Sequence, residues 1–193
     1  MDITLTHEFL SACYDLKDLT NSSTLAEFVK KLEKQAKSDT ARHDPMKYLG
    51  DGFELFVEAL IKLSPVDNRV GITNYQNAPY DEAGVDGFGL GLNGRPAAVQ
   101  VKFKSDHESL LTETRDNIAG FGMVAHSSSY NVLREDSATN LLVITYGEGL
   151  HPKTKEHFFR DGVRVLGRSE LRQLVDNNTM FWKHFADLVA AYV

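Results

Sequence analysis

Three features of the sequence indicate an α/β fold with a central mixed β-sheet flanked by helices. Asn93-Gly94 separates two extended runs, which is the strongest short-range signal for a β-hairpin. Residues 141–145 form an unbroken apolar run of strand length, as expected for a central strand covered on both faces. Segments before and after these strands carry apolar side chains at helical spacing. Strands interspersed with helices are typical of a mixed sheet flanked by helices.

Composition predicts a soluble globular protein of one domain with small additions. The chain has 193 residues, of which 42% are hydrophobic and 25% charged. No apolar run approaches the roughly 20 residues that span a bilayer, and residues 1–4 do not resemble a secretory leader. The single cysteine, Cys13, excludes an intrachain disulfide and is expected to be a small buried hydrophobe. We therefore expect a cytoplasmic protein that makes no membrane contact.

The net charge of −6 counts against a nonspecific nucleic-acid coat protein, because such proteins carry a basic excess. A nuclease remains compatible with this charge, since metal sites are built from acids and basic residues can gather on one face.

Two helices are predicted in the first 38 residues. Residues 4–16 are expected to form a short helix with Phe9, Leu10, Cys13 and Leu16 inward. The capping-box spacing of Thr24 and Glu27 predicts a second helix through Ala36. Its end is basic, and this basic edge is either a solvated face or a contact for a nucleic-acid backbone; its members are Lys30, Lys31, Lys34 and Lys37.

A third helix is predicted from Pro45, although Gly50 and Gly52 favour a true start near Asp51. A continuous apolar stripe runs from Leu49 to Leu63. Glu54 and Glu58 lie one turn apart on a flank of this stripe. At 100° per residue, Glu54 is predicted to lie nearer the buried face than Glu58.

The remaining elements follow in order. A strand is predicted at 70–75 and a helix after Ser105 or Asp106, with Leu110, Leu111, Ile118, Phe121 and Met123 as its apolar positions. Further along, the pattern predicts a helix at 153–159, a strand at 163–166, a helix after Ser169 and a last amphipathic helix over 181–192.

The hairpin carries the residues that point to chemistry. In its second run, Gln100, Lys102 and Lys104 alternate with apolar residues, and Asp86 lies on the partner run. A carboxylate, an amide oxygen and an ammonium on one sheet surface can hold a divalent metal and stabilise charge on a phosphate. The alternative is structural: Asp86 caps a turn, and Gln100 and Lys102 face solvent.

Other chemistries are set aside. The glycines of 87–91 lack the spacing of a phosphate-binding loop and are not followed by a helix. The seven histidines are scattered and have no cysteine partners, which argues against zinc, and the Gly-x-Ser-x-Gly motif of hydrolases is absent.

The order Glu54, Asp86, Gln100-x-Lys102 resembles the PD-(D/E)XK nuclease superfamily, which has a restriction-endonuclease-like core. It is closest to the Mrr-like branch, in which glutamine replaces the second acid. No proline precedes Asp86, a departure that this branch often shows. The resemblance divides the chain into an N-terminal helical extension (1–45), a nuclease core (46–176) and a C-terminal helix packed on the core (177–193).

The resemblance implies a Mg²⁺-dependent endonuclease, with Mn²⁺ as a substitute ion. Asp86, the side-chain oxygen of Gln100, the backbone carbonyl of Val101 and, through water, Glu54 would hold the metal. Lys102 would orient the attacking water or neutralise charge on the phosphate. Glu58 is the other candidate for the helix carboxylate, with Glu54 preferred.

The implied partner is double-stranded DNA, contacted by Lys104 and by Lys30, Lys31 and Lys34. A homodimer would place two sites about a twofold axis, as cutting both strands requires. No nucleotide cofactor is expected. Restriction, homing and phage-type enzymes are not separated, and RNA or branched DNA stays open as a substrate. The alternative function is a noncatalytic nucleic-acid-binding or protein-interaction module on the same fold.

Overall fold

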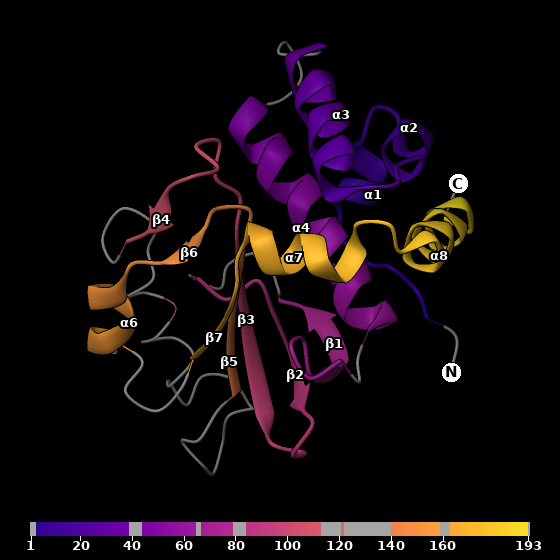
Figure 1. Ribbon diagram of the computed structural model, residues 1–193. Coiled ribbons are helices and arrows are strands. Elements are labelled where there is room, and N and C mark those ends of the chain that lie inside the picture. Colours follow the sequence, from indigo (N-terminus) through magenta and orange to yellow (C-terminus); the bar gives the residue numbers. More distant parts are fainter. Residues whose placement is uncertain are drawn as a thin grey trace. The chain divides into compact units, whose positions relative to one another are not determined.

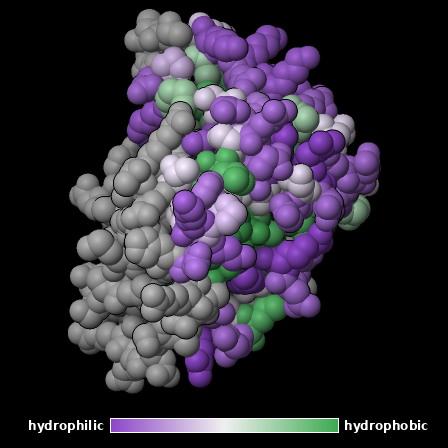
Figure 2. Space-filling view, turned by 60° about the vertical axis from the view of Figure 1, so that its left-hand side comes forward, coloured by the Kyte–Doolittle hydropathy of each residue, from purple (hydrophilic) through white to green (hydrophobic). Residues whose placement is uncertain are grey.

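The structure, a computed structural model, consists of two structural units. One is formed by Met1–Leu63 and Glu170–Val193, and the other by Ser64–Ser169. None of the described helices is both long and apolar enough to cross a membrane. On the face in Figure 2 the described side chains are mostly hydrophilic, with small separate hydrophobic patches. The described residues are 3–38, 44–64, 67–78, 84–112, 121, 140–158 and 163–192. The boundaries predicted at 45/46 and 176/177 stay a prediction.

The second unit is built on a five-stranded mixed sheet with the order β1-β2-β3-β5-β7 (Figure 1). β1 pairs antiparallel with β2, and β2 with β3, whereas β3, β5 and β7 run parallel. The predicted α/β class with a mixed sheet is therefore confirmed. The strands are β1 (Ile72–Asn77), β2 (Gly87–Gly91), β3 (Pro96–Lys102), β5 (Asn140–Thr145) and β7 (Val163–Leu166).

β3 is the middle strand, and its central residues are buried on both faces. Its alternation of apolar and polar residues therefore does not mark a solvent-facing side. Ala98, two residues before Gln100 and on the same face, belongs to an apolar cluster together with Val143 of β5. Position 100 is thus placed in the interior by its neighbours in the sheet.

The predicted hairpin between β2 and β3 is confirmed, with a loop longer than a two-residue turn. Gly94 has a φ of +74° and donates its N–H to the carbonyl of Gly91 at 2.9 Å. The N–H of Gly91 in turn donates to the carbonyl of Arg95 at 2.8 Å. This pattern is that of a type I turn followed by a left-handed glycine, which explains why glycine occupies position 94.

The glycines of β2 alternate along the strand and occupy its buried positions. A Cβ atom at Gly87 would lie 2.2 Å from the hydroxyl of Tyr75, and one at Gly89 would lie 2.6 Å from the carbonyl oxygen of Thr73. Glycine at positions 87 and 89 therefore allows β1 to lie close to β2. The register between these two strands also shifts here.

Replacing Gly89 with alanine is expected to destabilise the protein by about 3 kcal/mol, because the nearest atom is backbone and cannot rotate away. Gly50→Ala is the control: a Cβ there meets nothing within 4 Å, and alanine favours the helix that contains it. Urea unfolding measures both. Equal effects of the two substitutions would contradict the steric explanation.

One predicted helix is wrong at its beginning. Leu110 and Leu111 form β4 (Leu110–Leu111), which pairs in parallel with β6 (Gly149–Leu150). Asp106 caps a turn through Glu108 N–H instead of starting a helix. Phe121 is buried in the apolar cluster of this unit, whereas the predicted positions Ile118 and Met123 lie outside the described residues. The predicted helix at 153–159 is confirmed as α6 (Pro152–Phe158).

The first unit is helical, and its core is aromatic. Phe28 and Phe56 lie 5.4 Å apart between ring centroids, and Trp182 lies 6.1 Å from Phe56. Its helices are α1 (Phe9–Ala12), α2 (Leu16–Thr20), α3 (Leu25–Ser38), α4 (Pro45–Leu63), α8 (Thr179–Ala190) and most of α7 (Arg168–Val175).

Two helix predictions in this unit need correction. The helix predicted at 4–16 is two short helices, because the backbone is extended at Cys13 and Asp15 caps α2 by accepting from Asp18 N–H. α4 begins at Pro45 and not near Asp51. Gly52 lies within this helix, where its missing side chain leaves room for Leu32. The helix predicted from the Thr24 capping box through Ala36 is confirmed as α3, and Thr24 Oγ1 accepts from Glu27 N–H at 3.1 Å.

Candidate active site

Asp86 directly precedes β2 and contacts β3 on both sides of Gln100. Its N–H donates to the carbonyl of Val99 at 2.9 Å, and its Oδ2 accepts from the N–H of Val101 at 2.6 Å. The carboxylate is therefore held against the central strand by a short, charge-assisted hydrogen bond. The local cause is the hairpin, which brings residue 86 back alongside residues 99–101.

Gln100 is fully buried, with an exposed fraction of 0%. Among the described residues, neither oxygen nor nitrogen of its side-chain amide has a hydrogen-bond partner. Leaving a buried amide unsatisfied costs about 1–3 kcal/mol. The solvent-facing interpretation of Gln100 is therefore wrong, because β5 covers the edge of β3 and the sheet's apolar cluster lies on the same face.

Lys102 ends β3, two residues after Gln100 and on the same face. Its side chain is half-buried, and within the described part of the chain it forms no ion pair. Lys104 is only 9% exposed. Its side chain lies beside Gly147, where an added Cβ would come within 3.3 Å of Lys104 Cγ. Because so little of its side chain is exposed, Lys104 has little surface with which to make the predicted contact with DNA.

The donor chemistry of this site suits a hard cation without a complete protein cage. Over the residues that the structure describes, no three histidine, cysteine, aspartate or glutamate side chains gather as a metal-binding group. The second unit offers the carboxylate of Asp86 and the amide oxygen of Gln100, both oxygen donors. Mg²⁺ commonly binds through one or two protein oxygens and keeps several waters or substrate phosphates. This donor set fits Mg²⁺.

Glu54 and Glu58, the candidate helix carboxylates, belong to the first unit, and their burial is the reverse of the prediction. Glu58 is 0% exposed, whereas the Glu54 side chain is 29% exposed. The segment before α1 covers Glu58, whose oxygens accept from Thr6 N–H at 2.8 Å, His7 N–H at 3.0 Å and Lys62 Nζ at 2.6 Å. Because its oxygens already accept these hydrogen bonds, Glu58 has a structural role. Glu54 stays the candidate helix carboxylate because it is the more exposed of the two, and not because it is the more buried.

His7 is the neighbour of Glu54 that the sequence pattern did not reveal. Its Nε2 lies 3.0 Å from Glu54 Oε2. Burial lowers the pKa of the His7 ring, but the Glu54 hydrogen bond and the charges of Glu54, Glu58 and Asp51 outweigh it, so the pKa is raised. The N–H of Phe9 donates to Nδ1, a contact that needs the neutral ring with its proton on Nε2. No spacing rule links residues 7 and 54.

The lysines of the basic edge differ in their surroundings. Lys31 is held by Glu27 at 3.3 Å and Asp18 at 4.0 Å, and its ammonium also donates to the carbonyl of Asn21. Lys30 and Lys34 are exposed. The structure therefore separates Lys31 from the other predicted nucleic-acid contacts, because its charge is already paired within the helical unit.

The strand order and connections define an α/β protein with a mixed sheet, and comparison with known proteins adds one distant likeness. Among solved structures, the chain is similar to the MspJI restriction endonuclease in complex with a 27-mer oligonucleotide, at 17% identity and a TM-score of 0.43. The match covers 94% of this chain and 38% of that one, so the chain spans well under half of that enzyme's length. No protein-family model and no curated protein matches the sequence.

Proposed function

We propose that this chain is a Mg²⁺-dependent endonuclease that hydrolyses phosphodiester bonds of DNA. The observation that supports this most is the side chain of Gln100, a buried amide without a partner among the described residues. The backbone groups of its two chain neighbours, Val99 and Val101, both contact Asp86. Unsatisfied buried polar groups in folded proteins call for an explanation, and an absent ion or water is one. A bound cation would give the amide oxygen a partner, because that oxygen would be one of the ligands of the ion.

Asp86 and Gln100 would hold the ion in this site. Their two oxygens leave most of the coordination sphere to waters and substrate phosphate, the usual arrangement for Mg²⁺. When bound, the ion would polarise a phosphoryl oxygen and make a neighbouring water more acidic. Because glutamine is neutral where the related nucleases carry an acid, we expect metal affinity to depend strongly on the presence of the phosphate.

Asp86 and Lys102 have separate proposed roles in the reaction. The N–H of Val101 fixes the carboxylate of Asp86, so this group would already be oriented when the ion and the substrate bind. Lys102 lies on the same face of β3 and would place its ammonium where charge develops on the phosphate. Hydrolysis adds one water across a P–O bond and yields a phosphomonoester and a hydroxyl.

Several finer assignments stay predictions: the Mrr-like branch, double-stranded DNA as the preferred substrate, the homodimer, the metal-binding carbonyl of Val101 and the role of Glu54. The competing function is a noncatalytic nucleic-acid-binding or protein-interaction module. It differs in one respect that can be measured, since it predicts binding without a metal-dependent product.

The test is cleavage of supercoiled and linear DNA in Mg²⁺ and in EDTA. We expect nicking or cutting that requires Mg²⁺ and falls by at least about 10²-fold in Asp86→Ala and in Lys102→Ala, the size of effect seen when one transition-state contact is lost. Asp187→Ala on α8 and Lys153→Ala on α6 are matched controls that remove the same charges from exposed positions. They should cut like the parent protein.

Cutting that survives in both site variants would overturn this assignment of residues. DNA binding that is indifferent to Mg²⁺ and to Lys102→Ala, with no product from a genomic library of target sequences, would establish the binding module instead. The library removes the dependence on a rare target site.

A further inference from the structure

α3 carries a row of exposed lysines on the side away from the aromatic core. Lys30, Lys34 and Lys37 are all exposed, and among the described residues none of them forms an ion pair. Their spacing of four and three residues places them within about 60° of one another around a helix. The opposite side of α3, with Phe28 and Leu32, is fully buried.

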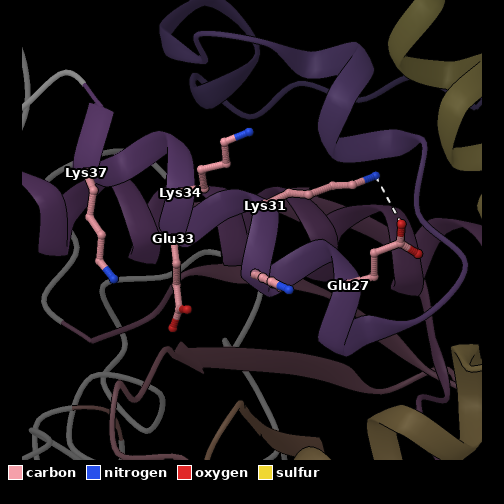
Figure 3. A pocket seen from close by; sticks show the side chains of 6 residues that line it. Glu27, Lys31, Glu33, Lys34 and Lys37 are labelled. Atoms are coloured by element: carbon pink, nitrogen blue, oxygen red, sulfur yellow. Dashed lines mark ion pairs between the residues drawn. The ribbon is translucent and has the colours of Figure 1, made fainter.

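These lysines line a shallow depression of about 630 Å³ together with Glu27, Lys31 and Glu33 (Figure 3). In this view Lys34 extends to one side of the helix, whereas Lys37 and Glu33 extend to the other. Lys31 reaches toward Glu27 and is paired with it. Three ammonium groups thus remain available for an outside partner. The lining groups also include two carboxylates, those of Glu33 and of Glu27, which is paired with Lys31.

We propose that this lysine face, defined as Lys30, Lys34 and Lys37, binds the phosphate backbone of duplex DNA without reading its sequence. Seven residues of helix span about 10.5 Å. Each DNA strand carries one phosphate per roughly 3.4 Å of axis, so the row spans about three phosphate-to-phosphate steps along one strand. Although the chain has a net charge of −6, this local cluster of cations creates a positive potential that attracts an anionic partner.

An anionic membrane is the other polyanion to consider, and the helix does not suit it. Helices that lie in a membrane interface insert an apolar face beside their basic one. The apolar face of α3 is occupied by the core, where Phe28 contacts Phe56 and Trp182. Only charge is left for binding, which is the sequence-independent mode of backbone recognition.

The choice of DNA as the polyanion rests on the proposed function, but the binding itself does not require catalysis. The experiment is therefore done in EDTA, on a labelled DNA duplex of about 25 base pairs, long enough to cover the lysine row. Fluorescence anisotropy measures binding over a series of salt concentrations. The variant carries Lys30→Gln, Lys34→Gln and Lys37→Gln together. Its matched control carries Lys153→Gln, Lys155→Gln and Lys183→Gln, three exposed lysines on α6 and α8 with the same total charge change.

We expect the slope of log affinity against log salt to fall by about 2.7 in the lysine-face variant, which is about 0.9 for each lost phosphate contact. The control triple variant and Lys31→Gln should keep the parent slope. A slope that is unchanged in the lysine-face variant, or that falls equally in the control, would overturn the proposal. The proposal would also be overturned if the lysine-face variant lost binding to phosphatidylserine vesicles but kept its binding to DNA. If the protein cuts no DNA and yet shows the lysine-dependent slope, the proposed function fails and this inference stands.

Discussion

Replacing Gln100 with leucine is expected to stabilise the folded protein by about 1–3 kcal/mol and to slow metal-dependent cleavage by at least about 10²-fold. The gain in unfolding free energy follows from the amide, which has no partner among the described residues, because leucine has a similar size and no polar group to leave unsatisfied. Its surroundings suit an apolar side chain, since Ala98 and Val143 beside it belong to the apolar cluster. A residue that costs stability where a simple hydrophobe would fit is expected at a functional site.

The loss of activity follows from the proposed role of the amide oxygen. With Asp86 as the remaining member of this pair, the site would lose one of the two side chains proposed to bind Mg²⁺ directly. We expect the cleavage rate to fall by at least about 10²-fold, because the ion and the phosphate would no longer be fixed together. Urea unfolding and the cleavage assay measure the two effects on the same preparation.

Thr145→Val is the matched control for this prediction. Thr145 is also 0% exposed, lies on the neighbouring strand β5 and has a partner, since its Oγ1 accepts from Gly147 N–H at 3.0 Å. Removing a satisfied hydroxyl should destabilise the protein by about 1 kcal/mol. If Gln100→Leu destabilises the protein as Thr145→Val does, the amide has a structural partner, and the central support for the proposed site is gone.

The second large effect is expected at Glu58, where replacement with alanine should cost about 3–5 kcal/mol of unfolding free energy. The carboxylate is fully buried and accepts hydrogen bonds from the backbone and hydroxyl of Thr6, from His7 N–H and from Lys62. Alanine would leave a mostly buried ammonium and two N–H groups without their acceptor, which is the costly way to break a buried ion pair. Lys62 also donates to the carbonyl of Thr4, so Glu58 and its ion-pair partner together hold the segment from Thr4 to His7.

Glu54→Ala tests the specificity of that effect on the same helix, one turn earlier. Its side chain is 29% exposed and contacts His7, so we expect a loss of about 1 kcal/mol or less. Hydrogen exchange of the Thr6 and His7 amides should accelerate in Glu58→Ala and not in Glu54→Ala. Similar losses of stability in both variants would show that the buried network contributes little.

Local patterns in the sequence were sufficient for the α/β class, the hairpin around Asn93-Gly94, the buried strand β5 and most helices. These features depend on neighbours in the chain: turn chemistry at Gly94, apolar periodicity in α3 and α4, and capping by Thr24. The proximity of Asp86 to Gln100 also follows from the hairpin, because a turn between two strands brings those residues together.

The burial of the polar residues, by contrast, depends on contacts between distant parts of the chain. Alternation in β3 is the same for a solvent-facing strand and a central one, and only its neighbours β2 and β5 show that Gln100 is buried. Helical periodicity placed Glu54 inward, but the segment before α1 covers Glu58 instead. Likewise, Leu110 and Leu111 became a strand because β6, much later in the chain, pairs with them. In each case the deciding contact comes from residues far away in the sequence, whose position no local pattern contains.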